Sequence, residues 1–423
     1  MMMVTRRWMA AAAAATTAML LLASCGGGTD RTKAQVRLVN ASSGYASLEL
    51  RVDDEVRQAG VSYGNSASYV EAKPGKSSAI FATGGASALL TFTASTEERK
   101  YYTVLAYGPA GLLKQVVLDE NQAEPDTGRS LLRVMNAASD IGPVDIYVTG
   151  VSESLETAVA VRTGIPIDSV GDFNTINSGT WRLRVTAAGS KPDLLVDIPS
   201  VTLSSKQVLT LVVTPAPGGI LGRALLLTQQ SGIANYATTL ARVRVASGLT
   251  GTSVRLGDSD LLAAGNLPSV SSYAVLAAGN QTLVATINGV AQPSTVQALA
   301  AGLDYTLLVH GTPAAPLYSW IEDDNTRPSD LAKAKVRLVN GVVGASGDLS
   351  MTVDGLQVAA GVQAGKGSAY QTQPASTTAD IVVASPSATL YSTIDQTFAA
   401  ASNYTVFVLG PSTAATGVLR KDR

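Results

Sequence analysis

Short apolar runs separated by polar turns extend along most of this chain. Residues 36–41 (Val-Arg-Leu-Val-Asn-Ala) alternate between apolar and polar side chains, which is typical of a β-strand. Residues 102–108 (Tyr-Thr-Val-Leu-Ala-Tyr-Gly) are almost continuously apolar or β-branched, as in a strand buried on both faces or one at the centre of a sandwich. Asn288-Gly289 and Asp354-Gly355 lie between apolar residues and predict hairpin turns. Because no helical periodicity persists beyond residue 25, the pattern predicts an all-β fold.

Two sequence markers recur four times in the same order. The first marker, built around an arginine and usually an asparagine, occurs at residues 36–41, 132–137, 243–247 and 336–341. The second marker, a Tyr-Thr or Leu-Thr pair followed by apolar residues, occurs at residues 102–108, 209–215, 305–311 and 404–410. Successive first markers lie about 90 to 110 residues apart, the size of an immunoglobulin-like sandwich. The repeats predict four tandem immunoglobulin-like or transthyretin-like β-sandwich domains.

Polar segments between the repeats predict the domain boundaries. We expect the four domains to span residues 34–121, 130–231, 240–325 and 334–423. The linkers between them are short, about ten residues each. Connections of this length predict a semi-rigid rod or arc of four domains.

The first 25 residues have the organisation of an export signal. Arg6 and Arg7 precede an apolar run over residues 9–22, which is too short to span a membrane by itself. The run ends in Leu22-Ala23-Ser24-Cys25, a box of small residues before a cysteine. This order of features predicts a cleaved secretory signal peptide.

The box at Cys25 resembles that of bacterial lipoproteins, which are cleaved just before the cysteine and lipidated on its sulfur. The resemblance implies a signal peptide over residues 1–24, palmitate or a similar acyl group on Cys25, and a flexible tether over residues 25–33. In the enterobacterial lipoproteins that this box resembles, an Asp after the cysteine favours the inner membrane. Because Gly26 stands there, we expect a protein of the bacterial cell envelope, lipid-anchored in the outer membrane.

Composition excludes several classes of protein. Cys25 is the one cysteine of the 423 residues, so the chain forms no disulfide within itself. The formal net charge is -1 and basic residues form no stripe, which argues against nucleic-acid binding. No apolar stretch after the signal approaches the about 20 residues of a spanning helix, so we expect lipid to be the membrane anchor.

The opening of the second repeat carries a further resemblance. Residues 133–139 (Arg-Val-Met-Asn-Ala-Ala-Ser) are followed by residues 144–150 (Val-Asp-Ile-Tyr-Val-Thr-Gly). This pattern resembles the start of the bacterial "domain of unknown function 4397" family, and residues 48–53 and 349–355 repeat its second half. The resemblance implies a sandwich fold and a cell-envelope setting, and it brings no activity with it.

Few side chains are suited to catalysis. His310 is the one histidine, and the equivalent positions of repeats one and four hold Tyr107 and Leu409, so we expect its ring to fill a packing slot. This inventory excludes zinc sites built from His and Cys. Trp181 and Trp320 lie in strand-like segments, which favours core packing over sugar stacking. We therefore predict no enzyme activity and no cofactor.

Two acidic clusters are candidates for a metal site. Asp119 and Glu120 end the first repeat, and Glu322, Asp323 and Asp324 end the third. Oxygen ligands at a domain junction suit Ca²⁺, so these five residues are candidate calcium ligands; the alternative is that they are solvated strand ends. Repeats two and four are expected to lack the cluster, since they have Gln229-Gln230 and Arg420-Lys421.

Together these features predict a non-catalytic cell-envelope lipoprotein, a lipid-anchored stack of β-sandwiches that acts as a scaffold, spacer or adhesion-type binding module. The alternative is an envelope protein that holds a glycan or peptide on loops at the end of a sandwich. An enzyme of unrecognised type is the third hypothesis. The expected partners are the membrane, through the lipid anchor, and a protein or glycan.

Overall fold

The computed structural model describes residue 30 and residues 32–423. The predicted signal peptide (residues 1–24), Cys25 and most of the tether lie outside the described residues. In the described part of the chain, no helix has the length and apolarity to cross a membrane.

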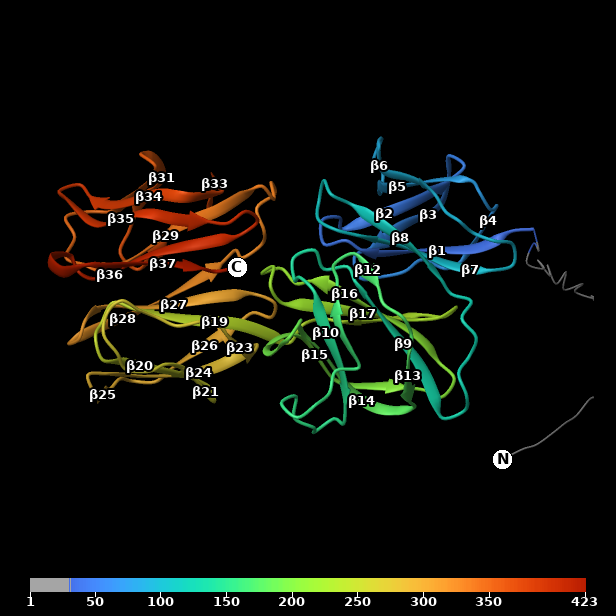
Figure 1. The fold of residues 1–423 in the computed structure, drawn as a ribbon, viewed down its shortest axis with the longest axis horizontal. Coiled ribbons are helices and arrows are strands. Elements are labelled where there is room, and N and C mark those ends of the chain that lie inside the picture. The colour runs from blue at the N-terminus through green and yellow to red at the C-terminus, as the bar shows by residue number, and fades with distance from the viewer. Residues whose placement is uncertain (1–29, 31) are drawn as a thin grey trace, which may run out of the picture.

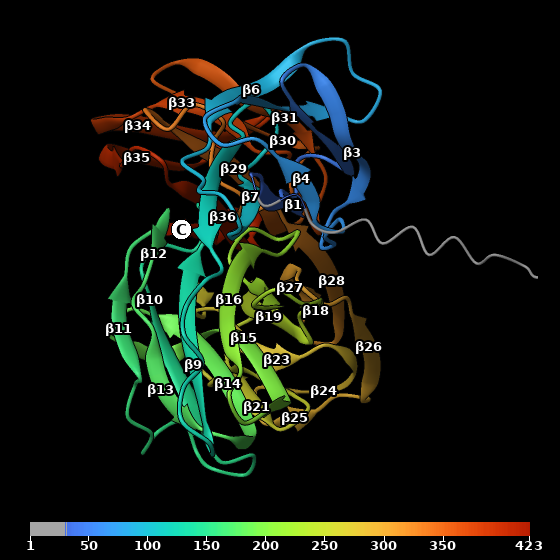
Figure 2. The same cartoon turned by 90° about the vertical axis from the view of Figure 1, so that its right-hand side faces the viewer.

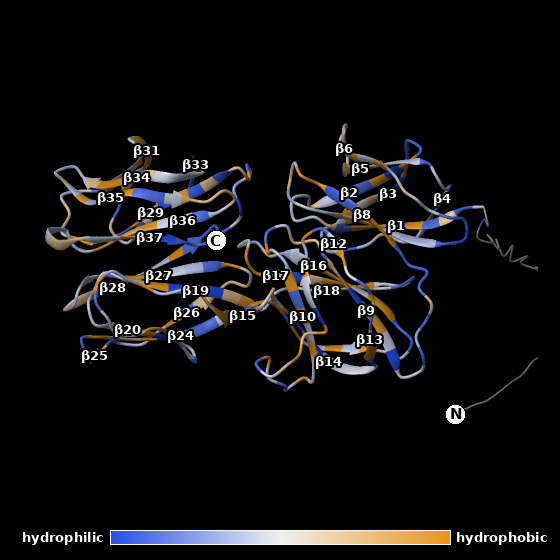
Figure 3. Cartoon of the chain, viewed as in Figure 1, coloured by the Kyte–Doolittle hydropathy of each residue, from blue (hydrophilic) through white to orange (hydrophobic). Residues whose placement is uncertain are grey.

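Each of the four repeats forms a sandwich of two sheets, which confirms the predicted all-β fold. In Figure 1, domain 1 (blue) and domain 2 (green) lie on the right, and domain 3 (yellow) and domain 4 (orange to red) lie on the left. We call the sheet that contains the first strand of a domain its inner sheet and the other its outer sheet. Figure 3 shows that hydrophobic residues concentrate on the strands of all four domains.

Domains 1 and 2 form the first half of the chain. Domain 1 consists of β1 (Ala34–Ala41), β2 (Ser47–Val52), β3 (Glu55–Ser62), β4 (Val70–Ala72), β5 (Ser77–Ala82), β6 (Ala88–Thr93), β7 (Tyr101–Tyr107) and β8 (Lys114–Asp119). Domain 2 consists of β9 (Arg129–Asn136), β10 (Val144–Thr149), β11 (Arg162–Ile165), β12 (Ser169–Val170), β13 (Asn174–Asn177), β14 (Gly179–Ala187), β15 (Ser190–Leu203), β16 (Val208–Pro215), β17 (Gly222–Thr228) and β18 (Ile233–Tyr236). Their inner sheets have the orders β4-β1-β7-β8 and β12-β9-β16-β17-β18, with β13 also on β9, and their outer sheets have the orders β3-β2-β5-β6 and β11-β10-β14-β15. We expected domain 2 to end at residue 231, but β18 extends its inner sheet to Tyr236.

Domains 3 and 4 repeat this topology. Domain 3 consists of β19 (Leu240–Ser247), β20 (Thr252–Leu256), β21 (Ser259–Leu262), β22 (Ser269–Val270), β23 (Ala274–Ala277), β24 (Gly279–Ile287), β25 (Val290–Ala291), β26 (Thr295–Leu299), β27 (Asp304–Thr312) and β28 (Ala315–Asp323). Domain 4 consists of β29 (Lys333–Val343), β30 (Leu349–Val353), β31 (Leu356–Val362), β32 (Lys366–Gly367), β33 (Gln371–Pro374), β34 (Ser376–Ser385), β35 (Ala388–Phe398), β36 (Asn403–Pro411), the 3-10 turn η1 (Ser412–Ala414) and β37 (Thr416–Lys421). Their inner sheets have the orders β22-β19-β27-β28 and β32-β29-β36-β37, with β23 on β19 and β33 on β29. Their outer sheets have the orders β21-β20-β24-β25, with β26 on β24, and β31-β30-β34-β35.

The two sequence markers form neighbouring parallel strands at the centre of every inner sheet. The parallel pairs are β1 with β7, β9 with β16, β19 with β27, and β29 with β36. In each pair the marker arginine lies opposite the marker threonine: Arg37 and Thr103, Arg133 and Thr210, Arg244 and Thr306, Arg337 and Thr405. The markers recur together because each pair joins the beginning of a domain to its end.

One face of each inner sheet packs on the outer sheet of its own domain. In domain 1, Leu38 and Val104 of the inner sheet share a buried cluster with Leu48 of the outer sheet. Leu307 and Val406 occupy the position of Val104 in domains 3 and 4, and all three are at most 1% exposed. This face forms the core that holds each sandwich together.

The other face of each inner sheet packs on the inner sheet of a neighbouring domain. Leu105 of domain 1 shares a buried cluster with Met135 of domain 2, and Leu308 of domain 3 shares one with Phe407 of domain 4. The predicted rod or arc is therefore wrong, since the domains pack as two back-to-back pairs (Figure 1). A linker of about ten residues can reach roughly 30 Å, which lets the chain fold back and remove this second apolar face from water.

The two pairs also touch each other, so the four domains lie two by two (Figure 2). The N–H of Gly218 in domain 2 donates a hydrogen bond of 2.8 Å to the carbonyl of Gly302 in domain 3. Nη1 of Arg423, after the last strand of domain 4, donates to the carbonyl oxygens of Gly219 and Asn325, each at 2.9 Å. The C-terminal residue thus links domain 2 to the segment that joins domains 3 and 4.

Candidate functional site

Every marker arginine is held by the threonine on the neighbouring parallel strand. Nε donates to the threonine Oγ1 at 2.8–3.0 Å in the pairs Arg37–Thr103, Arg133–Thr210, Arg244–Thr306 and Arg337–Thr405. Arg37 is 1% exposed, and Arg244 and Arg337 are each 2% exposed. A guanidinium buried to this degree requires a paired negative charge and further hydrogen bonds.

An aromatic ring covers each guanidinium, and in three domains a carboxylate completes the cluster. The ring centroids lie 4.5–4.8 Å from the guanidinium carbon and belong to Tyr69, Phe173, Tyr273 and Tyr370. The carboxylates accept hydrogen bonds from the threonine and tyrosine hydroxyls and belong to Glu120, Asp323 and Asp422. Burial raises the pKa of both Tyr273 and Tyr370 well above the usual range, so their hydroxyls stay neutral and donate.

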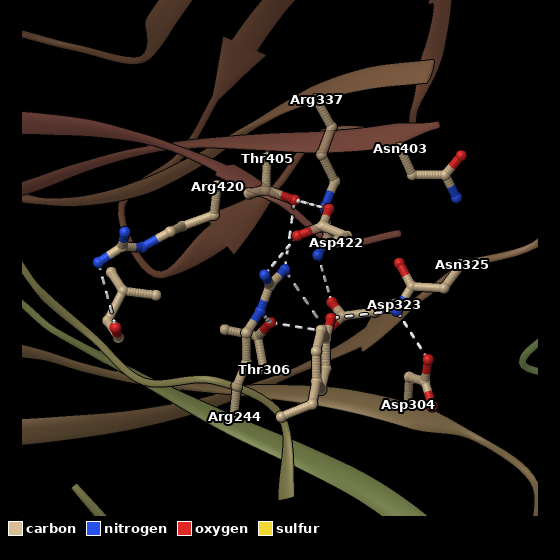
Figure 4. Close-up of polar contacts among 12 residues, drawn as sticks. Arg244, Asp304, Thr306, Asp323, Asn325, Arg337, Asn403, Thr405, Arg420 and Asp422 are labelled. Carbon is tan, nitrogen blue, oxygen red and sulfur yellow. Dashed lines mark hydrogen bonds and ion pairs between the residues drawn. The ribbon is translucent and has the colours of Figure 1, made fainter. Parts of the chain in front are cut away.

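Domains 3 and 4 exchange these carboxylates across their interface (Figure 4). Arg244 of domain 3 pairs with Asp422 of domain 4, and Arg337 of domain 4 pairs with Asp323 of domain 3. Nη2 of Arg244 also lies 3.9 Å from Asp323. The four charged side chains are at most 3% exposed and their charges balance. The cluster therefore stabilises one particular register between the two inner sheets.

The pair of domains 1 and 2 is less symmetric, because domain 2 supplies no carboxylate. In the β16–β17 hairpin, Gln229 follows Thr228 at the position that an acid occupies in the other domains, and Phe173 replaces the tyrosine. Arg37 instead pairs at 2.7 Å with Glu120 of its own domain and donates to backbone carbonyls of domain 2. The N–H of Gln230 bonds the other oxygen of Glu120 at 2.9 Å, so this cluster also joins two domains.

The structure divides the five candidate calcium ligands into two groups. Glu120 and Asp323 are buried against arginines, so the interpretation as solvated strand ends is wrong for these two. Asp119, Glu322 and Asp324 are exposed. Within residues 30 and 32–423, no group of three or more His, Cys, Asp or Glu side chains is placed to hold a metal ion.

The expectation that repeat four lacks an acid at this position is also wrong. Asp422 follows Lys421, which pairs with Tyr404 as Asp119 pairs with Tyr102, and so occupies the position of Glu120. It lies one residue beyond the Arg420-Lys421 pair. The strand register identifies Asp422 as the equivalent residue, whereas the types of the neighbouring residues do not.

Asp304, at the start of β27, is a buried carboxylate with one oxygen unpaired. It is 0% exposed, and its Oδ2 accepts a hydrogen bond of 2.7 Å from Asn325 and lies 3.3 Å from Nη1 of Arg242. Its Oδ1 has no partner among the described residues. Burial raises the pKa of Asp304 to about 6, despite the opposing effect of Arg242.

This raised pKa predicts a loss of stability as the pH rises. Below about pH 3.8 the Asp304 carboxyl is protonated in both the folded and the unfolded chain. Between about pH 3.8 and about pH 6 the carboxyl of the unfolded chain is ionised while that of the folded chain still holds its proton, which favours unfolding. Asp304→Asn removes this titration, so the unfolding free energy of the variant relative to wild type should rise by about 3 kcal/mol from pH 3.5 to pH 7.5. Urea unfolding at both pH values measures the difference, and a difference independent of pH would contradict the prediction.

The histidine and the tryptophans pack as the sequence predicts. His310 is 7% exposed at the interface of domains 3 and 4, its Nε2 lies 2.9 Å from Oγ of Ser319, and burial lowers its pKa. Trp181 and Trp320 are partly buried against the cores of domains 2 and 3. None of these side chains stands in a group suited to nucleophilic catalysis.

A cavity of about 930 Å³ lies where domains 1 and 2 meet the linker between domains 3 and 4. Its walls are the 107–112 segment of domain 1, the 139–140 and 215–217 loops of domain 2, and residues 326–329 of the linker. The volume is within the usual range for a small-molecule site. Loops at the ends of three separate structural units thus converge on one space, as in many binding sites.

Five charged side chains line this cavity, and two of them are already paired with each other. Lys114 and Asp168 form an ion pair of 2.6 Å. Arg223 stacks 4.7 Å from the ring centroid of Tyr63 and donates to Asn235 at 2.6 Å, but its Nε is shielded from solvent without a partner. The remaining two charged residues are Asp140, which lies 3.7 Å from Arg423, and Arg327.

Arg327 is the least satisfied charge in this lining. Its Nε is buried without a partner, and within the described part of the chain no hydrogen bond or ion pair holds its guanidinium. Positive charges lie close together in this region. Burial lowers the pKa of the Arg423 guanidinium to about 10, and the positive charge of Arg327 also lowers it. Sequence reasoning missed this residue because the 326–331 linker shows no motif and becomes part of a cavity only when the domains pack.

Comparison with protein families identifies one match. Residues 34–147 match the family model described as "Domain of unknown function (DUF4397)", the family that the sequence resembles. The match covers domain 1 and ends within β10 of domain 2. No curated protein matches the chain.

Several solved structures are distantly similar to this chain. A candidate cell adhesion protein from Bacteroides uniformis ATCC 8492 is 12% identical with a TM-score of 0.22, over 48% of this chain and 99% of that one. The family 26 carbohydrate-binding module CBMbc of Eubacterium rectale Amy13K, solved with maltoheptaose, is 11% identical with a TM-score of 0.17, over 45% of this chain and 95% of that one. The Bacillus anthracis TIE protein is 8% identical with a TM-score of 0.16, over 88% of this chain and 68% of that one. These values are too low to transfer a function.

Proposed function

We propose that this chain, whose residues 34–147 match a domain family of unknown function, is a non-catalytic lipoprotein of the bacterial cell envelope. Its four sandwiches act as one scaffold or adhesion-type binding module. The observation that carries the proposal is the burial of both faces of every inner sheet, which joins the domains into pairs. A block built in this way presents fixed loops and outer sheets to a partner, whereas separate domains on linkers would not.

The proposed anchor is lipid on Cys25, with attachment to the outer membrane. The residues before domain 1 support it, because a short positive region, an apolar run and a small-residue box precede this cysteine. Few residues separate Cys25 from β1, which begins at Ala34. The block therefore stands close to the membrane. A role as a long spacer, which would need a rod, is less well supported than a role as a scaffold or binding module.

Changing Cys25→Ser tests the anchor. We expect the variant to leave the membrane fraction and appear as a soluble or uncleaved form, because no acyl chain can be attached to serine by this route. Gly28→Ser is the matched control and should stay in the membrane fraction. Sucrose-gradient separation should place the wild-type protein with outer-membrane markers. Unchanged fractionation of Cys25→Ser, or wild-type protein with inner-membrane markers, would contradict the corresponding part of the proposal.

A second function, the binding of a small ligand on sandwich end loops, is favoured by the cavity between domains 1 and 2 and the linker. Its walls are mostly loops, with a few residues from the ends of strands, and it holds both apolar and charged side chains. Such a combination orients a ligand through few polar contacts while the apolar walls remove its body from water. A scaffold alone would not require an unpaired arginine in this position.

A further inference from the structure

We infer that this cavity binds a small ligand through a single carboxylate group, held by Arg223 and Arg327. The inference rests on the second proposed function, ligand binding, and names the chemistry of the ligand. It is independent of the lipid anchor, since none of the residues involved belongs to the N-terminal segment.

Arg327 is a charged side chain of the cavity wall without a partner of its own in the described part of the chain. The N–H groups of an arginine form a fork that fits a carboxylate, and a partly buried arginine normally has such an acceptor. Arg327 lines the cavity and has no hydrogen-bond or ion-pair partner among the described residues. An anion in the cavity supplies an acceptor for the terminal N–H groups of Arg327, which are not among the buried atoms.

The charge of the lining limits that anion to one negative charge. Lys114, Arg223 and Arg327 are positive, and Asp140 and Asp168 are negative, so the lining carries a net charge of about +1. A dianion such as phosphate would face the two carboxylates with excess negative charge. A carboxylate matches the net charge, and its planar pair of oxygens fits the fork of N–H groups on arginine.

The remaining walls indicate the body of the ligand. Pro109, Leu112, Pro217, Pro328 and Leu331 supply apolar surface around the charged groups. A volume of about 930 Å³ accommodates a few amino acids or sugar units. The face of Tyr63 is covered by Arg223, so the pocket does not offer this ring for sugar stacking. Two sources of a carboxylate fit: the C-terminus of a short peptide and the acid group of a uronic sugar.

The test is calorimetric titration of the full chain, purified in detergent, at pH 8, where inorganic phosphate is mainly the dianion. The carboxylate probes are N-acetyl-trialanine and glucuronate; the neutral probes are N-acetyl-trialanine amide and the methyl ester of glucuronate; inorganic phosphate is the dianion. We expect one or both carboxylates to bind, and the arm that binds identifies the source. We expect the neutral probes and phosphate to bind at least tenfold more weakly.

Variants locate the binding. Arg327→Gln and Arg223→Gln should each weaken the bound carboxylate by about tenfold to a hundredfold, the range for a hydrogen bond to a charged group. Arg255→Gln, on a side chain that is 52% exposed in domain 3, is the matched control and should bind like wild type. Ser329→Trp, which fills the cavity from an exposed linker position, should abolish binding without lowering the melting temperature.

Three results would overturn the inference. The first is that neither carboxylate binds at 10 mM. The second is that Arg327→Gln, Arg223→Gln and the wild type bind the carboxylate equally tightly. The third is that phosphate binds as tightly as the carboxylate. If the neutral probes bind as tightly as the acids and Ser329→Trp still abolishes their binding, the ligand-binding function stands and only the carboxylate assignment fails.

Discussion

An Asp323→Ala chain is expected to lose about 3–5 kcal/mol of unfolding free energy, one of the two largest effects that the structure predicts. Asp323 is 1% exposed and pairs with Arg337 across the interface of domains 3 and 4. It also accepts hydrogen bonds from the hydroxyls of Tyr273 (2.6 Å) and Thr306 (2.7 Å). Removing the carboxylate leaves a buried guanidinium and two hydroxyl groups without their acceptor, and the surrounding sheets exclude the water that could replace it.

Glu322→Ala is the matched control for this prediction. Glu322 precedes Asp323 on the same strand but is exposed, so its removal should change the unfolding free energy by less than about 0.5 kcal/mol. Urea unfolding followed by tryptophan fluorescence suits the comparison, because Trp320 lies on the same strand, β28. Equal stabilities of the Asp323→Ala and Glu322→Ala chains would show that the cluster contributes nothing to the interface.

A double variant separates pairing from simple burial. Asp323→Leu combined with Arg337→Met replaces both charges by apolar side chains of similar size. Such a replacement of a whole buried pair is often neutral or stabilising, so this chain should be more stable than Asp323→Ala. If it is as unstable as Asp323→Ala, the loss comes from the hydroxyl partners Tyr273 and Thr306 and not from the unpaired Arg337.

The sequence was sufficient for the strands and the repeat, because both follow from local rules. Alternation and turn residues mark the strands, and the two markers recur because the first strand of each domain pairs in parallel with a strand near its end. The continuous apolar run at residues 102–108 predicts a strand buried on both faces or at the centre of a sandwich, and the structure shows the first of these. The sequence does not predict what covers the second face. A leucine at position 105 fits a strand that faces its own outer sheet and equally a strand that faces a neighbouring domain.

The candidate site shows the same limit more sharply. Glu120 and Asp323 stood out as acids at strand ends, but the partner of Asp323 is an arginine in the next domain. Domain 2 offers an internal control: where Gln229 replaces the acid, Phe173 replaces the tyrosine that would donate to it. An alignment of the four repeats in the correct register would show that these two replacements occur together in domain 2. Nothing local marks Arg327, because its surroundings come from three separate parts of the fold.

Phe407→Ala is the second variant with a large expected effect, a loss of about 3–5 kcal/mol. Phe407 lies on β36, is 0% exposed, and packs with Leu308 of domain 3 between the two inner sheets. Its ring centroid also lies 4.8 Å from the guanidinium carbon of Arg244, so the cavity left by alanine would remove contacts from the charged cluster as well. The free energy of unfolding in urea measures the loss.

Phe398→Ala distinguishes an interface effect from a core effect. Phe398 is 1% exposed but lies inside the domain 4 sandwich, so both variants delete the same side-chain atoms from buried sites. Hydrogen exchange separates them, because amides report the stability of the unit that must open. Phe407→Ala should accelerate exchange in β19 and β27 of domain 3 as well as in β29 and β36, whereas Phe398→Ala should act mainly in domain 4. Unchanged exchange in domain 3 for Phe407→Ala would mean that the paired inner sheets do not stabilise each other, and the four domains would then not act as one block.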